Sequence, residues 1–200
     1  MMRGTPYVYQ GEELGMTNAH YNDISQYRDV ESLNYYKILL DQGKTKEQAL
    51  KVLAARSRDN SRTPMQWSDD KNAGFTEGTP WIEAPENYKE INAETELKDP
   101  DSIYSFYKKL IALRKEKDII AEGTIEFLEK ENADVLAYRR NYQGEELIVL
   151  NNLTAENVTI RQQPEWKAYQ KRLGNYEKIT AEDGKITLRP FETIVLDSAL

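Results

Sequence analysis

The stretch AEGTIEFLEKENADVLAYRRNYQGEELIVLN, residues 121–151, changes the period of the chain from helical to alternating. Apolar and polar side chains alternate in it, and Gln143-Gly144 marks a tight turn between two β-rich runs. Further runs of the same kind follow it, separated by turn residues. The strands that we predict are 124–129, 135–141, 146–151, 158–161, 167–173, 185–188 and 193–196. Short strands spaced this closely predict an antiparallel β-sandwich.

Two consecutive helices are predicted ahead of this β-rich part. Residues 29–41 place apolar side chains at helical spacing, and Gly43 ends the pattern. Thr45 is followed three residues later by Gln48, which predicts a capping box at the start of the second helix. That helix turns Ala49, Leu53 and Ala54 inward and ends near Arg56.

Residues 57–92 show no sustained period and are rich in Gly, Pro, Asn, Asp and Trp. So long a loop within a compact domain is uncommon unless it serves a binding site, and the alternative is a packed surface loop without a function. Helical signals return at Asp99-Pro100 and continue to about Lys117. The chain therefore divides into a mixed part, 1–120, and an all-β part, 121–200.

The beginning of the chain is the feature that suggests a longer protein. Residues 5–9 are aromatic and β-branched and predict a strand, which stops at a turn between Gly11 and Gly15. A free domain rarely opens on a strand that looks buried, so we expect the chain to be part of something longer.

Composition excludes several classes of function. With 27 basic and 34 acidic residues the net charge is −7, which argues against nucleic acids and anionic membranes as partners. The chain has no cysteine, which excludes disulfides and thiolate metal sites and suggests a cytoplasmic location. One histidine excludes a multi-histidine metal site, and we expect no metal and no cofactor. No apolar run is long enough to span a membrane, and the first residues lack the apolar core of a secretory signal.

Charged residues gather at two places that could carry chemistry. Glu12 and Glu13 follow the first predicted strand, a position where barrel enzymes often place functional carboxylates. Arg56, Arg58 and Arg62 lie within seven residues around an aspartate. Guanidinium groups could clamp a carboxylate, a phosphate or sugar hydroxyls there, and the alternative is internal ion pairing that fixes the long loop.

Three aromatic residues lie along the same loop. Trp67, Phe75 and Trp81 could stack on the apolar faces of sugars, or they could anchor a loop that has little regular structure.

Two long motifs resemble a known enzyme family. GTPYVYQGEELGM, residues 4–16, resembles the last-strand motif of the α-amylase family of glycoside hydrolases. RDNSRTPMQW at 58–67, with NAGF at 72–75 and Pro80-Trp81, resembles its α-glucosidase branch, which holds oligo-1,6-glucosidases, dextran glucosidases and trehalose-6-phosphate hydrolases. Residues 16–20, 26–34 and 57–62 resemble the trehalose-6-phosphate hydrolases most.

The resemblance implies an α+β chain: the C-terminal remnant of a (β/α)8 barrel, with strand 8 and the following helices, plus an antiparallel β-sandwich. It also implies a retaining mechanism in which a nucleophile, a glutamic acid and a stabilising aspartate come from strands 4, 5 and 7. No matching carboxylate motif occurs here, so we assign no catalytic residue and expect this chain alone to be inactive.

Substrate binding is the role that the resemblance carries over to this chain. Arg62 matches an arginine at the floor of the −1 subsite, where it pairs with an aspartate from the N-terminal half of the enzyme and contacts the far hydroxyls of the non-reducing glucose. Arg58 supports it or the adjoining acceptor site, and Glu13 matches a position near the acceptor subsite.

The expected function is that of the C-terminal part of an α-glucosidase that hydrolyses trehalose 6-phosphate to glucose and glucose 6-phosphate. The alternatives are an oligo-1,6-glucosidase or dextran glucosidase acting on isomalto-oligosaccharides, or a non-catalytic sugar-binding or accessory module. Half a barrel exposes sheet edges, so we also expect self-association through the barrel remnant.

Overall fold

The computed structural model describes residues 1–198, so the last two residues of the predicted 121–200 domain lie outside it. The chain forms two compact units, one of Tyr7–Ser105 and one of Met1–Pro6 with the residues from Phe106 onward. Each is described by itself. Along the chain the second division falls between Ser105 and Phe106, and the predicted domain boundary at residue 120 stays a prediction.

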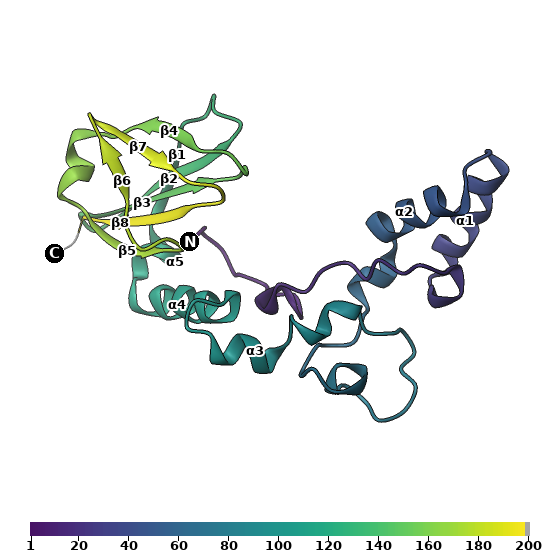
Figure 1. Ribbon diagram of the computed structural model, residues 1–200. Helices are drawn as coiled ribbons and strands as arrows, with labels where there is room; N and C mark the ends of the chain where they lie inside the picture. The colour runs from purple at the N-terminus through teal and green to yellow at the C-terminus, as the bar shows by residue number, and fades with distance from the viewer. Residues whose placement is uncertain (199–200) are drawn as a thin grey trace. The chain divides into compact units, whose positions relative to one another are not determined.

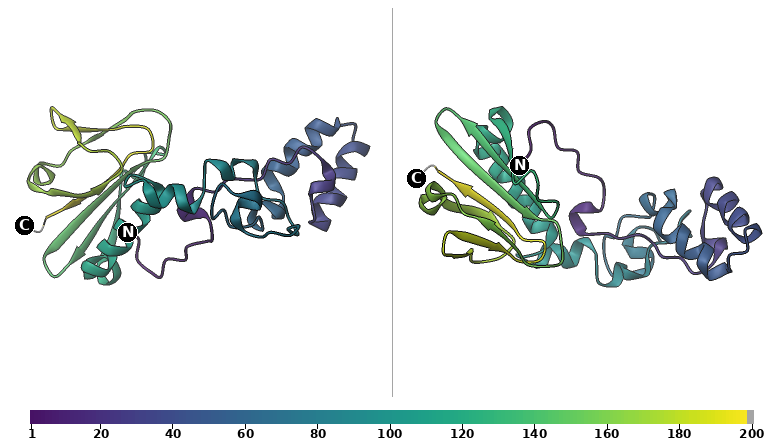
Figure 2. Two further views of the ribbon diagram at one scale, coloured as in Figure 1. Left: turned by 60° about the horizontal axis from the view of Figure 1, so that its bottom comes forward. Right: turned by 90° about the horizontal axis from the view of Figure 1, so that it is seen from above.

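The second unit contains two antiparallel sheets (Figure 1). The larger has the order β1-β2-β3-β8-β5 and the smaller the order β4-β7-β6. The strands are β1 (Thr124–Leu128), β2 (Val135–Tyr142), β3 (Glu145–Asn152), β4 (Val158–Arg161), β5 (Gln170–Gly174), β6 (Thr180–Glu182), β7 (Lys185–Leu188) and β8 (Thr193–Asp197). The two sheets face each other as separate layers in Figure 2. The predicted antiparallel sandwich is confirmed.

The apolar run in β3 is buried on both faces of the larger sheet. Ile148 and Leu150 pack between the two sheets, where Trp166 of the one-turn helix η6 (Pro164–Ala168) joins them. Leu147 and Val149 point to the other face and pack with residues of α4 (Ile103–Glu116) and α5 (Asp118–Glu122). A strand buried on both faces loses its alternation, which explains the continuous aliphatic run.

All seven predicted strands exist, and three short elements, β6, α5 and η6, escaped prediction. β6 consists of three exposed residues and has no apolar alternation that could reveal it. The short helix α5 begins one residue after Lys117, and its Ile119 and Ile120 are fully buried. The predicted strand 167–173 begins later, at Gln170, because η6 occupies the preceding residues.

A buried arginine ties the start of the chain to this unit. Arg140 of β2 is 0% exposed and donates to the carbonyl oxygens of Thr124 at 2.9 Å and Met1 at 2.7 Å. It also donates to those of Ile120 at 2.9 Å and Gly123 at 2.8 Å. Burial lowers the pKa of Arg140, and these four carbonyls replace the water that the guanidinium loses.

The first unit is helical and contains no strand. Its helices are α1 (Val30–Asp41), α2 (Lys46–Arg56) and α3 (Ala93–Lys98), with one-turn helices η1 (Glu12–Leu14), η2 (Ile24–Gln26), η3 (Arg58–Ser61), η4 (Lys71–Gly74) and η5 (Glu86–Lys89). The capping box of Thr45 and Gln48 is confirmed. α1 and α2 lie side by side (Figure 1), with Tyr36, Leu39, Ala49 and Leu53 in a shared core.

The spacing within residues 29–41 predicts that the first helix turns Val30, Leu33, Tyr36 or Lys37, and Leu40 inward. Ser32, Tyr36 and Leu39 are its buried residues, whereas Val30 is 69% exposed. Val30 is the first residue after the N-cap Asp29. Tyr36 is buried as predicted, and Leu33 and Leu40 are partly buried against the same core, so the prediction is wrong for Val30.

The third predicted helix begins later than Asp99-Pro100. α4 starts at Ile103, and the Ser102 hydroxyl, which accepts from Ser105 N at 3.1 Å, provides its cap. Asp99 instead accepts from Asp101 N at 2.8 Å and ends α3. α3 escaped prediction.

Residues 5–9 do not form the predicted strand. They have no regular secondary structure, and Tyr7 is 90% exposed. A strand exists only when a neighbour satisfies its backbone groups, and no strand among residues 1–198 pairs with this segment. The glycine turn that follows is confirmed, because η1 lies between Gly11 and Gly15, at φ of 90° and 70°. No helix in residues 1–198 is long and apolar enough to cross a membrane.

Candidate functional site

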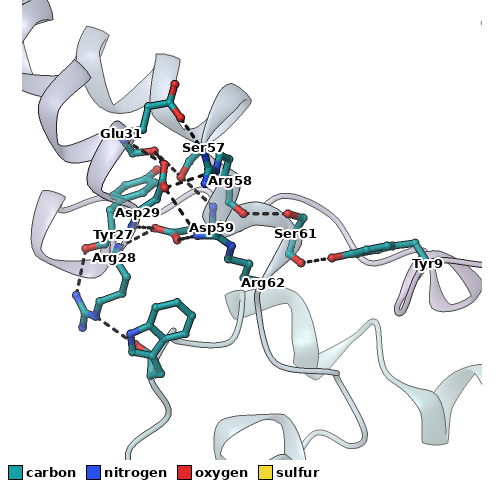
Figure 3. Close-up of polar contacts among 12 residues, drawn as sticks. Tyr9, Tyr27, Arg28, Asp29, Glu31, Ser57, Arg58, Asp59, Ser61 and Arg62 are labelled. Carbon is teal, nitrogen blue, oxygen red and sulfur yellow. Dashed lines mark hydrogen bonds and ion pairs between the residues drawn. The ribbon is translucent and has the colours of Figure 1, made fainter.

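The candidate site is built on the turn that follows α2. Ser57 ends the helix, and its hydroxyl accepts from Asp59 N at 3.1 Å. Asn60 Nδ2 donates to the carbonyl of Ala54 at 2.9 Å, and the Ser61 hydroxyl donates to that of Arg58 at 2.9 Å. These contacts hold both arginines of the RDNSR motif on one short 3₁₀ turn (Figure 3).

Asp59 is the buried centre of this turn and is 0% exposed. Its Oδ2 accepts from the backbone N–H of Arg28 at 2.7 Å and of Asp29 at 2.9 Å (Figure 3). Its Oδ1 makes no hydrogen bond and lies 3.9 Å from Arg62 Nη1. A buried carboxylate needs such donors because it has lost its water, so Asp59 fastens the turn to the segment before α1.

Asp29 is the second buried carboxylate and also caps α1. Its Oδ2 accepts from the Ser32 backbone N–H at 3.1 Å and from the Ser32 hydroxyl at 2.8 Å. Its Oδ1 lies 3.7 Å from both Arg58 Nε and Arg62 Nη1. Burial opposes ionisation, but the hydrogen bonds from Ser32 and the charges of Arg58 and Arg62 hold the pKa of Asp29 below its usual value.

The two arginines share Asp29 and remain accessible. Arg58 also pairs with Glu31, with Nη1 3.0 Å from Oε2, and its side chain is 61% exposed. The Arg62 side chain is 37% exposed. The internal ion pairing that the sequence left open is thus present, and guanidinium N–H groups still face solvent.

Glu13 lies on a different element from the arginine pair. It belongs to η1, and its Oε2 accepts from the backbone N–H of Gly11 at 2.8 Å. One carboxylate oxygen therefore closes the glycine turn. The structure brings Arg58 and Arg62 together and shows no hydrogen bond or ion pair between Glu13 and either of them among the described residues.

A hollow of about 310 Å³ borders this turn. Gly11 and Glu12 line it from the segment around η1, and Ser57, Asn60 and Ser61 line it from the arginine turn. The Tyr9 hydroxyl donates to the Ser61 carbonyl at 2.5 Å (Figure 3). The volume lies in the range of small-molecule sites, and the lining offers both polar and apolar surface.

The three loop aromatics are all accessible. Trp67 and Phe75 are each 51% exposed, and Trp81 is 65% exposed. The Trp81 carbonyl accepts from Arg28 Nε at 3.1 Å, which fastens this end of the loop to the segment before α1. Among residues 1–198 no group of three or more acidic or histidine side chains could hold a metal ion.

Sequence reasoning missed the two carboxylates that hold the arginines. Asp29 carried only the signal of a helix cap, and Asp59 was one member of a charged run. Nothing in the sequence pairs them, because they are 30 residues apart along the chain.

Two family models match the chain. The model described as "Alpha amylase, catalytic domain" matches residues 1–123, and "Alpha-amylase SusG C-terminal domain" matches residues 135–195.

Similar proteins include trehalose-6-phosphate hydrolases and an oligo-1,6-glucosidase. The Bacillus subtilis trehalose-6-phosphate hydrolase is 49% identical over 98% of this chain and 35% of its own length. The Escherichia coli one is 46% identical over 96% of this chain and 35% of its own length. The Bacillus cereus oligo-1,6-glucosidase is 44% identical over 98% of this chain and 36% of its own length. The chain thus spans 35–36% of the length of these relatives.

Solved structures of related enzymes are also similar to this chain. The Bacillus licheniformis trehalose-6-phosphate hydrolase has a TM-score of 0.91 at 47% identity, over 98% of this chain and 36% of its own. The trehalulose synthase MutB of Pseudomonas mesoacidophila MX-45 has a TM-score of 0.85 at 36% identity, over the same shares.

Proposed function

Because the chain belongs to the α-amylase family of glycoside hydrolases, we propose that it forms part of an α-glucosidase. The proposed reaction is hydrolysis of trehalose 6-phosphate to glucose and glucose 6-phosphate. Support comes from the two trehalose-6-phosphate hydrolases, which are 49% and 46% identical to this chain. We assign no catalytic carboxylate to these 200 residues, and the chain alone is expected to be inactive.

The arginine pair is the observation that carries this proposal. Arg58 and Arg62 both lie 3.7 Å from one buried carboxylate oxygen of Asp29, and both keep exposed side chains. Two oriented guanidinium groups can donate to several hydroxyls of one glucose unit. We assign Arg62 to the −1 subsite, Arg58 to its support and Glu13 to the neighbourhood of the acceptor subsite.

A chimera tests this proposal. The corresponding third of the Bacillus subtilis trehalose-6-phosphate hydrolase is replaced by this chain, and hydrolysis of trehalose 6-phosphate, isomaltose and p-nitrophenyl α-glucoside is measured. We expect the chimera to prefer trehalose 6-phosphate and the 200 residues alone to turn over none of the three. Turnover by the 200 residues would overturn the assignment of the catalytic carboxylates to the rest of the enzyme.

Arg62→Lys in the chimera tests the residue assignment. Loss of a charged, forked contact costs about 1.5–3 kcal/mol, so kcat/KM is expected to fall about 10-fold or more. Arg161→Lys on the exposed part of β4 is the matched control, with unchanged kinetics expected. Wild-type kinetics for Arg62→Lys would remove Arg62 from the subsite.

The second candidate function is that of an oligo-1,6-glucosidase or dextran glucosidase. The Bacillus cereus oligo-1,6-glucosidase, at 44% identity, supports it. A chimera that turns over isomaltose faster than trehalose 6-phosphate would favour it. A chimera that binds sugar without turnover would favour a non-catalytic accessory role.

The proposal extends to location and assembly. We place the protein in the cytoplasm, because its sequence contains no cysteine and the proposed substrate is a phosphorylated sugar. We also propose self-association through the exposed, unpaired segment that contains Tyr7, Val8 and Tyr9. Light scattering at rising protein concentration tests this, and a constant monomer mass would contradict it.

A further inference from the structure

A hollow of about 710 Å³ lies beside the α1–α2 helix pair. Three cations line it: Lys44, Lys51 and Arg56. Tyr35 of α1 lines it together with Gln48, Val52 and Ala55 of α2. It belongs to the helical unit alone.

Helical geometry explains why the α2 residues share this hollow. Gln48, Lys51, Val52, Ala55 and Arg56 stand at positions i, i+3, i+4, i+7 and i+8, so they occupy one side of the helix. The residues that α2 buries, Ala49, Leu53 and Ala54, form the neighbouring stripe.

The charge of the hollow is opposite to that of the chain. The net charge is −7, yet no aspartate or glutamate in the described part of the chain lines this hollow. Within residues 1–198, Lys44, Lys51 and Arg56 also make no ion pair. Unpaired cations along the lining of one hollow raise the local concentration of anions.

The rest of the lining indicates a ligand that has an apolar surface as well as a negative charge. Val52 and Ala55 are apolar, and the ring of Tyr35 is 45% exposed beside them. Gln48 Oε1 accepts from Thr45 N in the capping box, which leaves its Nε2 to donate. The volume lies in the range of small-molecule sites. A sugar could place its C–H face on the apolar residues and a hydroxyl on Gln48.

We propose that this hollow binds the phosphate monoester of a sugar, with the phosphate held by Lys44, Lys51 and Arg56. Arg56 also lines the 310 Å³ hollow beside the arginine turn. The inference rests on the helix pair and does not depend on the proposed function.

Binding of three probes to the chain tests this inference. Glucose 6-phosphate, inorganic phosphate and glucose are titrated, and binding is followed by calorimetry and by backbone amide NMR shifts. We expect glucose 6-phosphate to bind more tightly than inorganic phosphate and glucose to show no saturable binding. Shifts are expected at the hollow residues of α1 and α2.

Variants identify the hollow as the site. Lys51→Gln removes a charged contact that lines this hollow and not the 310 Å³ hollow, whereas Arg56→Gln removes one that both hollows share. Each variant is expected to weaken glucose 6-phosphate binding about 10-fold. Arg56→Lys keeps the charge and should retain most of the affinity. Lys46→Gln is the matched control, because Lys46 lies on the same helix and does not line the hollow. All of these side chains are exposed, and circular dichroism checks that the variants stay folded.

Three results would overturn the inference. The first is the absence of saturable glucose 6-phosphate binding. The second is an equal loss of glucose 6-phosphate affinity in Lys51→Gln and Lys46→Gln. The third is binding of glucose as tightly as glucose 6-phosphate. Inorganic phosphate binding as tightly as glucose 6-phosphate would remove the sugar from the assignment. Because no turnover is measured, none of these results bears on the proposed hydrolysis.

Discussion

Replacement of Asp59 by asparagine is the sharpest test of how the candidate site is held. The change keeps the size of the side chain and removes its charge. In the structure Asp59 Oδ2 accepts from two backbone N–H groups, at 2.7 and 2.9 Å, and Oδ1 lies 3.9 Å from Arg62 Nη1. An amide can keep an oxygen toward the two N–H groups only by turning its NH2 group toward the Arg62 guanidinium.

The expected cost follows from these contacts. A hydrogen bond to a charged acceptor contributes about 1 kcal/mol more than a neutral one, so two weakened bonds cost about 2 kcal/mol. Loss of the Arg62 attraction adds up to about 1 kcal/mol, since Arg62 is partly exposed. The neutral amide avoids the desolvation of a buried charge, which offsets part of this sum. We therefore expect Asp59→Asn to lower the free energy of unfolding of the helical unit by about 2 kcal/mol. Asp59→Ala orphans both N–H groups and should cost about 4 kcal/mol.

Tryptophan fluorescence during urea unfolding measures this effect. Trp67 and Trp81 lie in the helical unit and Trp166 in the β unit, so the measurements are made in a Trp166→Phe background. For a unit of about 100 residues, a loss of 2 kcal/mol also lowers Tm by about 8–16 °C. A double-mutant cycle with Arg62→Gln should give a coupling of about 1 kcal/mol.

Asp69→Asn is the matched control, because Asp69 is an exposed carboxylate of the same loop. Its substitution is expected to change the free energy of unfolding by less than about 0.5 kcal/mol. If Asp59→Asn has as small an effect as this control, Asp59 does not anchor the turn, and the reasoning is refuted.

Three further predictions concern charge and backbone packing. Arg140→Met should lower the free energy of unfolding of the β unit by about 3 kcal/mol or more, because carbonyls such as that of Met1 lose their donor. Thermal unfolding measures this loss. Unchanged protection of residues 1–6 in hydrogen exchange would contradict the prediction. The depressed pKa of Asp29 contributes stability above its unfolded value of about 3.8, and this is lost as pH falls through the lower folded value. Asp29→Asn should therefore reduce the loss of unfolding free energy at acid pH. An unchanged loss would count against the role of Asp29 as partner of Ser32, Arg58 and Arg62. Gly123→Ala should lower the free energy of unfolding, measured in urea, by about 2 kcal/mol. The added Cβ would overlap the carbonyl oxygen of Ile119 and lie 3.0 Å from that of Asn141. Wild-type stability would show that the backbone shifts to make room.

Local signals explain which elements could be predicted. The capping box of Thr45 and Gln48 and the hairpin turn at Gln143-Gly144 involve hydrogen bonds between residues close in sequence. Seven strands followed from alternation and turn residues alone. β6 and α3 are three and six residues long, too short to show a period.

The residues of the candidate site also differ in whether local sequence could predict them. The RDNSR motif identified Arg58 and Arg62 as candidates, because a resemblance to a family is carried by residue order. Their shared partner could not be predicted, since Asp29 lies 29 residues before Arg58 along the chain. Which residues α1 buries depended in the same way on where α2 packs.

The sequence by itself therefore determined the family, the antiparallel β-sandwich, the helices α1 and α2 and the position of the arginine motif, because periodicity, caps and motifs are properties of neighbouring residues. Only the tertiary structure decided that Asp29 and Asp59 hold the arginines, that Arg140 binds the carbonyl of Met1 and that residues 5–9 stay unpaired. Each of these contacts, or its absence, depends on segments distant in sequence, which only the folded path of the backbone brings together.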